Sequence, residues 1–243
     1  MVLLISFFCL SGFASNKVVN WGVVPNSLEK TPEPPVGGAE LLQKYNGIFV
    51  ANTDKKEIFF TFDLGYEAGY TSEVLDIMAK HNIKATFFLC GHYLNEDVLV
   101  RRMIADGHVI GNHTNKHKDL PTLSEAAIRA DVTEFTTMFD EKYGTEYGKP
   151  LTQFRHPKGR ISERDMKIVN ELGLKTILWS GAIVDWGKTP IDAQSNADKL
   201  TKRAHPGGIY LLHISNSGMP KMLDLLIPQL VEKGYTIGNA WEL

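Results

Sequence analysis

Two histidines separated by three residues are the most informative feature of this 243-residue chain. They begin and end the segment His113-Thr114-Asn115-Lys116-His117. At this spacing two imidazole nitrogens can reach one divalent metal ion, either on one turn of a helix or across a tight loop. The same spacing is common among histidines that are only solvated or hydrogen-bonded. The pair alone therefore leaves a metal site and a structural role equally open.

A metal ion at this pair would give nearby polar residues a chemical purpose. It would lower the pKa of a bound water molecule and polarise a carbonyl group. Asp63 is the candidate base for that water, and Arg155 would keep the carboxylate ionised and oriented. His213 could donate a proton to a leaving group, with Asp185 raising its pKa and fixing its tautomer. A turn-closing role for Asp63 and a core role for His213 are the structural alternatives.

Other motifs narrow the chemistry further. Trp186 could form an apolar wall against a sugar ring or an acetyl methyl group, although an ordinary core indole fits as well. His92 and His156 are expected to have structural or rim roles, and Cys90 to be a small buried hydrophobe. The chain contains no G-x-S-x-G, P-loop or dinucleotide motif after a predicted strand, which disfavours covalent and nucleotide chemistry.

The elements that must position these residues follow from the hydrophobic pattern. Short β-branched or aromatic runs alternate with helical stretches from Glu57 onward. The predicted strands are 57–62, 84–90, 108–112, 152–156, 175–179, 208–214 and 235–239, and the predicted helices are 71–82, 95–106, 123–143, 162–172, 190–204 and 219–233. This alternation predicts parallel strands with right-handed crossovers, in a barrel or an open doubly wound sheet.

The polar residues all lie at the same ends of these strands. Asp63, His113, Arg155, Asp185 and His213 each end or follow a predicted strand. The carboxyl ends of the strands in a β/α barrel build one active site, so we expect the five side chains to converge.

Capping patterns mark several helix ends. Thr122 and Glu125 form a capping-box pattern, and Thr189 precedes Pro190 at a predicted helix start. Glycines stand where helices need a left-handed terminator, at Gly107, Gly144, Gly173 and Gly234.

Composition bounds the class of protein. The net charge is -2 with 43% hydrophobic residues, and the pI is near 6.4. No basic field is available for a phosphate backbone, so nucleic acid is not an expected partner and a neutral or carbohydrate substrate fits better. The length allows one well-packed domain.

The N-terminal region predicts export. Residues 1–14 are apolar and end in Gly12-Phe13-Ala14, as in a signal peptide, although no Lys or Arg precedes the run and a buried helix is the alternative. The run is shorter than the ~20 residues that span a bilayer, so no membrane span is expected after leader removal.

Residues 15–56, with the Pro- and Gly-rich stretch 30–38, predict an irregular arm on a main domain of residues 57–243.

The ordered motifs resemble those of the polysaccharide deacetylases, carbohydrate esterase family 4, over about residues 57–240. They are Thr61-Phe62-Asp63-Leu64-Gly65, His113 to His117, Arg155-His156-Pro157-Lys158-Gly159, Asp185-Trp186 and Leu211-Leu212-His213. The resemblance implies an irregular (β/α) barrel with about seven parallel strands. It also implies site roles: a base at Asp63, metal ligands at His113 and His117, a supporting arginine at Arg155, an oxyanion-binding N–H at Lys158, and an acid pair of Asp185 with His213.

Leu64 departs from the family pattern, which has a metal-binding Asp at this position. An apolar side chain cannot coordinate, so we expect a weakly held divalent metal ion, zinc by preference. Glu67 could replace the carboxylate, but a substrate-facing loop with Tyr66 and Tyr70 is the favoured interpretation.

The longer signature from Thr61 to Thr71, with Asn112 before the histidine segment, looks like one subgroup of the family. That subgroup lacks the second Asp and removes the acetyl group from N-acetylmuramic acid in peptidoglycan, in making the muramic δ-lactam of spore cortex. The resemblance implies a peptidoglycan glycan strand as partner and a place in the cell wall or spore envelope. Two alternatives stay open: a chitin or N-acetylglucosamine deacetylase, and a glycan-binding pseudoenzyme disabled at Leu64.

Overall fold

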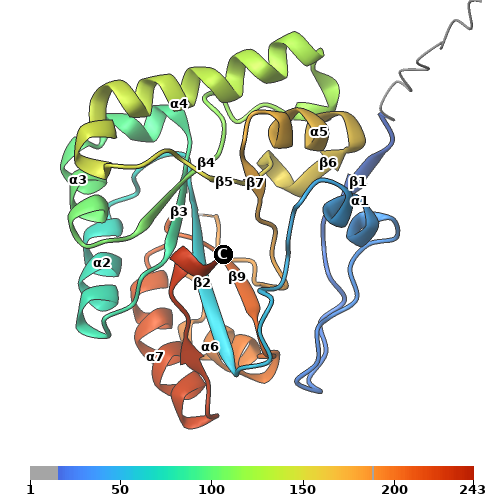
Figure 1. Ribbon diagram of the computed structural model, residues 1–243. Helices are drawn as coiled ribbons and strands as arrows, with labels where there is room; N and C mark the ends of the chain where they lie inside the picture. Colours follow the sequence, from blue (N-terminus) through green and yellow to red (C-terminus); the bar gives the residue numbers. More distant parts are fainter. Residues whose placement is uncertain (1–15, 188) are drawn as a thin grey trace, which may run out of the picture.

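A parallel β-sheet curls into an irregular barrel (Figure 1). The predicted site residues lie at or shortly after the carboxyl ends of its strands. The computed structural model describes residues 16–187 and 189–243, so the predicted signal peptide lies outside the described residues. Among the described residues, no helix has the length and apolarity to cross a bilayer.

Seven strands follow one another in the order β7-β5-β4-β3-β2-β9-β8, and every neighbouring pair is parallel. An eighth strand, β10, pairs in parallel with the beginning of β2. The predicted irregular (β/α) barrel with about seven parallel strands is therefore confirmed. The strands are β2 (Glu57–Leu64), β3 (Thr86–Leu89), β4 (Val109–Asn112), β5 (Gln153–Phe154), β7 (Lys175–Thr176), β8 (Gly181–Ala182), β9 (Gly208–His213) and β10 (Thr236–Ile237).

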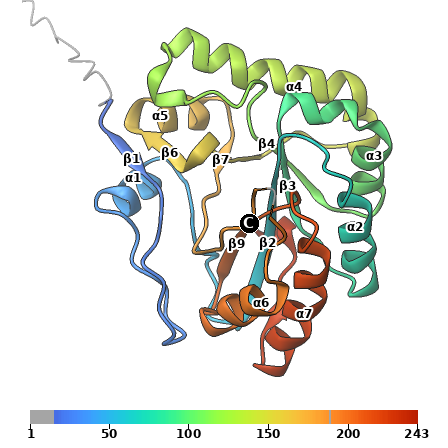
Figure 2. The ribbon, with the colours of Figure 1, turned by 180° about the vertical axis from the view of Figure 1, so that it is seen from behind.

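Helices connect the strands and cover the outside of the sheet (Figures 1 and 2). The α-helices are α2 (Thr71–Lys80), α3 (Asp97–Ala105), α4 (Glu125–Tyr147), α5 (Glu163–Glu171), α6 (Ala193–Lys202) and α7 (Met219–Glu232). Short 3₁₀ turns are η1 (Gly91–Asn95), η2 (Leu120–Thr122), η3 (Pro157–Gly159) and η4 (Ala240–Glu242). This is the βα alternation that the hydrophobic pattern predicts.

The side chains of β2 alternate between two apolar layers, as the two-residue period of a strand requires. Phe60, Phe62 and Leu64 belong to the large core cluster that includes the buried faces of the helices. Phe59 belongs to a smaller cluster inside the barrel, to which β3 and β9 also contribute. Asp63 has the parity of Phe59, so its carboxylate is directed toward the mouth of the barrel.

The N-terminal arm is more regular than its Pro and Gly content predicts. It contains β1 (Val18–Asn20), which pairs antiparallel with β6 (Arg160–Ser162), and the helix α1 (Gly38–Lys44). Farther along, Ile48 forms a bridge with Ile177 after β7, and Val50 forms a bridge with the first residue of β9. The arm therefore forms backbone bridges both to the segment after β7 and to the start of β9, two strands that do not pair with each other. These bridges explain how the backbone of the arm becomes ordered.

Candidate active site

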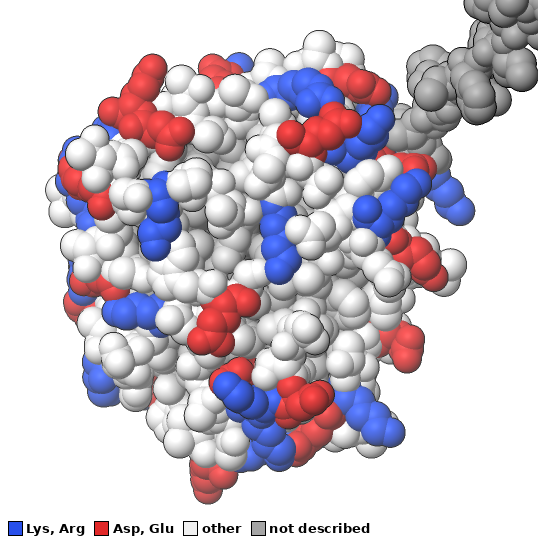
Figure 3. Space-filling model, viewed as in Figure 1, with Lys and Arg blue, Asp and Glu red and all other residues white. Residues whose placement is uncertain are grey.

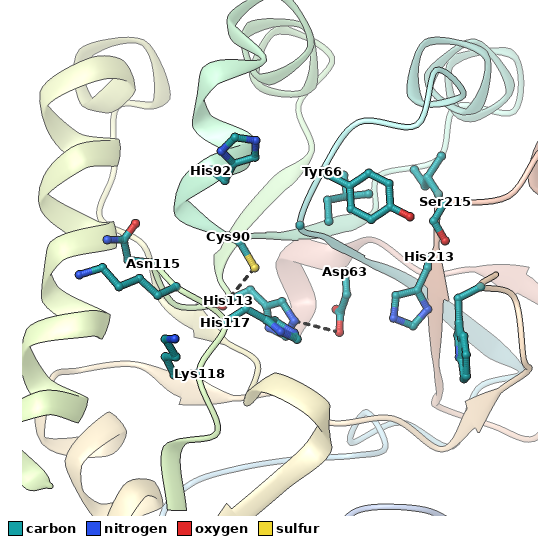
Figure 4. Close-up of a pocket in the computed structure, with 15 residues that line it drawn as sticks. Asp63, Tyr66, Cys90, His92, His113, Asn115, His117, Lys118, His213 and Ser215 are labelled. Carbon is teal, nitrogen blue, oxygen red and sulfur yellow. Dashed lines mark hydrogen bonds and ion pairs between the residues drawn. The ribbon is translucent and has the colours of Figure 1, made fainter. Parts of the chain in front are cut away.

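Asp63 is the centre of the site. It lies opposite His213 in the register of β2 and β9. One carboxylate oxygen accepts a hydrogen bond from Arg155 Nη1 at 2.9 Å. The other, Oδ2, lies 3.5 Å from His113 Nε2. His113 and Arg155, which is 92 positions from Asp63 in the sequence, thus share one carboxylate. Figure 4 shows His113 and His213 on either side of Asp63.

The surroundings of Asp63 keep it ionised. Its burial raises the pKa, but electrostatic interactions with Arg155, His113 and His213, of which Arg155 contributes most, outweigh that effect and hold the pKa below its ordinary value. An ionised carboxylate at the mouth of the barrel can accept a proton, as a general base must.

Arg155 is a fully buried side chain whose position is fixed by several contacts. Its Nε donates to the carbonyl oxygen of Ile177 at 2.9 Å, and its guanidinium lies 4.2 Å from the centroid of the Phe88 ring. With the bond to Asp63, these contacts allow the guanidinium little freedom. The structure therefore places Arg155 as a support for the carboxylate.

His113 directs an unprotonated ring nitrogen, Nε2, into the site. Its Nδ1 lies 2.8 Å from the carbonyl oxygen of Arg155, which can only accept, so Nδ1 carries the proton. Burial lowers the pKa of His113 to about 4, so the ring is neutral near pH 7. Its Nε2 lone pair then faces the carboxylate of Asp63, and a cation nearby would satisfy both groups. This is the tautomer and orientation that metal-binding imidazoles adopt.

The two histidines meet across a tight loop and not on a helical turn. Thr114 and His117 have φ values of 68° and 50°, and the His117 N–H donates to Thr114 Oγ1 at 2.9 Å. The side-chain oxygen of Asn112 accepts from the Thr114 N–H at 2.8 Å. Left-handed backbone at a β-branched residue is strained. This conformation of the loop places the ring centroids of His113 and His117 4.9 Å apart.

On the opposite side of Asp63, His213 and Asp185 form the predicted acid pair. Asp185 is fully buried and uses both oxygens on His213, one 2.9 Å from Nδ1 and one accepting from the backbone N–H at 2.7 Å. Burial lowers the pKa of His213, but the hydrogen bond and charge of Asp185 outweigh it and raise the pKa above its usual value. Because Nδ1 donates to Asp185, Nε2 is the position from which a proton can be delivered.

A cavity of about 710 Å³ opens over these groups. Its lining includes Asp63, His113, His117 and His213, and two aromatic side chains at its edge, Tyr66 and Trp186, are 59% and 64% exposed. The exposure of Trp186 disfavours the alternative of a core indole. A cavity of this size with apolar walls and convergent polar groups is typical of a small-ligand site.

Two predicted substrate contacts lie elsewhere. Tyr70 stands before α2 and packs against the large core cluster, outside the residues that line the cavity. Lys158 also lies outside the lining, in η3 with a left-handed φ of 61°, although its charge acts on His117. Glu67 is engaged by Gly69, Thr71 and Tyr93, so it is a loop-stabilising carboxylate.

Several lining residues were not singled out from the sequence. Asn115 and Lys116 lie within the histidine segment, and Ser215 follows His213 by two positions, so proximity to a motif was the available signal. Cys90 is buried, as the sequence predicts, but its place in the lining of the cavity was not predicted. Its thiol donates to the carbonyl oxygen of His113 at 3.5 Å, and burial raises its pKa to about 12. Only the folded structure brings it beside the histidines.

Comparisons with known proteins agree with this geometry. The family described as "Polysaccharide deacetylase" matches residues 50–177. Peptidoglycan-N-acetylmuramic acid deacetylase PdaA of Bacillus subtilis is 37% identical over 230 residues, 94% of this chain and 86% of that protein. The solved structure of B. subtilis PdaA, a family 4 carbohydrate esterase, superimposes with a TM-score of 0.86 at 35% identity, covering 94% of this chain and 97% of that one.

Two further relatives are more distant. A peptidoglycan-N-acetylglucosamine deacetylase of Bacillus cereus is 32% identical over 198 residues, 79% of this chain and 70% of that protein. A solved pseudoenzyme of carbohydrate esterase family 4 from Bacillus anthracis has a TM-score of 0.73 and 28% identity, covering 81% of this chain and 68% of that one.

Proposed function

Since the chain belongs to the polysaccharide deacetylase family, we propose that it is a metal-assisted hydrolase that removes the acetyl group from N-acetylmuramic acid residues of peptidoglycan. The observation that carries hydrolysis is the placement of Asp63 between the unprotonated Nε2 of His113 and the imidazole of His213, which is held by Asp185. The muramic acid preference is supported by the similarity to PdaA over nearly the whole chain.

The residues divide the reaction between a base and an acid. A divalent ion, zinc in our proposal, would be held by His113 and His117 and would supply carbonyl polarisation and an acidified water. Asp63 would take a proton from the water molecule that attacks the carbonyl carbon of the acetamide. His213 would then donate a proton from Nε2 to the nitrogen that leaves as the free amine. The products are acetate and a glucosamine-type amino sugar carrying the lactyl ether.

Supporting residues would hold this arrangement in place. Arg155 would keep Asp63 ionised and pointed at the water, and Asp185 would keep His213 charged and correctly rotated. Tyr66 and Trp186 would flank the sugar at the mouth of the cavity. The backbone N–H of Lys158 is our candidate for a contact to the oxyanion. Tyr70 would act indirectly, through the loop that precedes α2.

Export completes the proposal. Residues 1–14 would act as a signal peptide, residues 15–56 as an arm and residues 57–243 as the catalytic domain. The substrate, a peptidoglycan glycan strand, would be met in the cell wall or spore envelope. There, removal of the acetyl group would free the amine that closes a muramic δ-lactam.

One observation favours a different function. Leu64 packs in the apolar layer under the helices, where the family pattern has a carboxylate, and a pseudoenzyme of the same family shares the fold. A glycan-binding protein without turnover would bind muramoyl glycan equally well before and after Asp63→Asn, because binding would not use the base. The retained base, arginine and acid pair argue against this candidate.

Acetate release tests the proposal directly. The protein is incubated with stem-peptide-free muramoyl glycan and, in parallel, with chitin oligomers, each with and without added zinc. We expect acetate from the muramoyl glycan in the presence of zinc, little from chitin, and none with Asp63→Asn. Release from chitin alone would instead identify an N-acetylglucosamine deacetylase, and no release from either glycan under any metal would overturn hydrolysis.

A further inference from the structure

We propose that Cys90 supplies a third protein ligand to the metal site, beside His113 and His117. The ligand atoms of these three residues lie within 4.8 Å of one another. The inference rests on the metal site of the proposed function, but it does not depend on the identity of the sugar.

The distances suit one ion with small side-chain rotations. Zinc binds thiolate sulfur at about 2.3 Å and imidazole nitrogen at about 2.0 Å, so the ligand atoms of a tetrahedral site lie about 3.3–3.6 Å apart. Cys90 Sγ already points toward the histidine segment, 3.5 Å from the carbonyl oxygen of His113. Figure 4 shows the sulfur on the same side of the cavity as the two imidazoles.

The backbone brings Cys90 next to Leu64, the position at which the family pattern has the metal-binding carboxylate. Cys90 follows β3, and its N–H donates to the carbonyl oxygen of Leu64 at 3.0 Å. The next N–H, that of Gly91, lies 3.2 Å from carbonyl oxygens of Thr114 and Asn115. A side chain at Gly91 would collide with Asn115, since an added Cβ would lie 1.7 Å from its Oδ1. The end of β3 is thus pressed between residue 64 and the histidine loop.

A cysteine ligand would conserve the charge of the site while changing its selectivity. Thiolate and carboxylate each contribute one negative charge, so the ion would be balanced as it is by an Asp ligand. Sulfur is the softer donor, and a site of two nitrogens and one sulfur favours zinc over magnesium or manganese. Binding would release the thiol proton to solvent, because metal coordination deprotonates a thiol. The remaining position would be open to water or to the substrate carbonyl.

Cobalt(II) gives a readout that does not depend on activity. The full chain is treated with a chelator, loaded with cobalt and examined by absorption spectroscopy. We expect visible d–d bands that report the bound ion, together with an intense near-ultraviolet sulfur-to-cobalt charge-transfer band. The charge-transfer band should persist in Cys9→Ser, the control for the other cysteine of the chain, and disappear in Cys90→Ala.

Zinc affinity, measured by competition with a chromophoric chelator, gives a second readout. Cys90→Ala should weaken zinc binding at least tenfold, roughly the lower bound seen when even an outer-shell partner is removed. Cobalt d–d bands without a sulfur band in the unmodified protein would overturn the inference and leave the hydrolase proposal standing. Loss of the sulfur band in Cys9→Ser would overturn it as well. Failure to bind any cobalt would remove both this ligand and the metal site of the proposed function.

Discussion

Asp63 and His213 lie directly opposite each other in the parallel strands β2 and β9. The register of these two strands therefore sets the relative position of the base and the acid of the proposed reaction. The backbone pairing that sets this register continues for six residue pairs from Ile58 to Asp63. A shift by one residue would turn Asp63 away from the barrel mouth and into the apolar layer beneath the helices. The relative position of the two groups is thus a property of the sheet and not of a mobile loop.

Asp63→Asn should reduce kcat by about 10²–10⁴-fold, because an amide cannot accept the proton of the attacking water. It should also lower the free energy of unfolding by about 3 kcal/mol, since Arg155 would lose its buried counter-charge. Acetate release and urea unfolding measure the two effects. A variant with unchanged stability would show that the Asp63–Arg155 pair does not hold the guanidinium in place.

The pH dependence of activity should follow His213. Asp185 raises the pKa of His213, so the protonated acid persists to higher pH than an isolated histidine would allow, and activity falls as pH rises through that raised pKa. Asp185→Asn removes the charge, so the alkaline limb of the kcat profile should move to lower pH. On the acid side of the profile, the lowered pKa of Asp63 keeps its carboxylate ionised at pH values at which an ordinary Asp would be protonated. An alkaline limb that did not move in Asp185→Asn would rule out His213 as the titrating acid.

His117 is the proposed metal ligand best suited to a clean test, because its side chain is exposed enough to be removed with little repacking. His117→Ala should lower zinc affinity by at least about tenfold with little change in thermal stability. His92→Ala, which alters another histidine that lines the cavity, is the matched control and should keep the affinity of the unmodified protein. Equal losses in both variants would point to a general effect of the cavity and not to coordination.

The order of strands and helices could be predicted from the sequence because the hydrophobic period and the strand ends agree. Gly107, Gly173 and Gly234 have positive φ as expected of helix terminators. Gly144 does not, since α4 continues to Tyr147 and ends at Gly148, with φ 71°. The extra turn buries Tyr147 against Phe139 and Trp241, contacts that local sequence cannot reveal.

Helix starts were less predictable for a similar reason. Ser124, and not Thr122, caps α4 by accepting from the Ala127 N–H. Asp192 caps α6 by accepting from the Ser195 N–H, so the predicted start at Thr189 and Pro190 is too early. Each predicted cap stands two or three residues before another side chain that can accept the same kind of hydrogen bond.

The convergence of Asp63, His113, Arg155 and His213 could be predicted from the positions of strand ends, but their detailed chemistry could not. The tautomer of His113 depends on the carbonyl oxygen of Arg155, 42 residues away. β8 was missed because two residues, Gly181 and Ala182, are too short to show a period. The approach of Cys90 to the histidines likewise depends on the pairing of β3 with β4.

Trp186→Ala should raise KM for the glycan by about two- to tenfold and leave kcat nearly unchanged, because aromatic contacts are worth about 0.5–1.5 kcal/mol and the indole lies at the edge of the cavity. Val184→Ala removes a neighbouring side chain that is 70% exposed and does not line the cavity, so it serves as the control. A fall in kcat with no change in KM would place Trp186 in the chemical step.

Trp21 tests whether the arm is part of the cooperative fold. It is 6% exposed, its indole N–H donates to the carbonyl oxygen of Trp179 at 2.9 Å, and its backbone N–H donates to Gly159 at 2.7 Å. Trp21→Ala should therefore lower the free energy of unfolding by about 3–5 kcal/mol, the usual cost of truncating a buried aromatic side chain. Leu28→Ala alters an arm residue that is 69% exposed and should change stability little. Urea unfolding followed by far-UV circular dichroism measures both variants. If the two had equal, small effects, the arm would unfold separately from the barrel, and its hydrogen bonds to residues around η3 would not support the site.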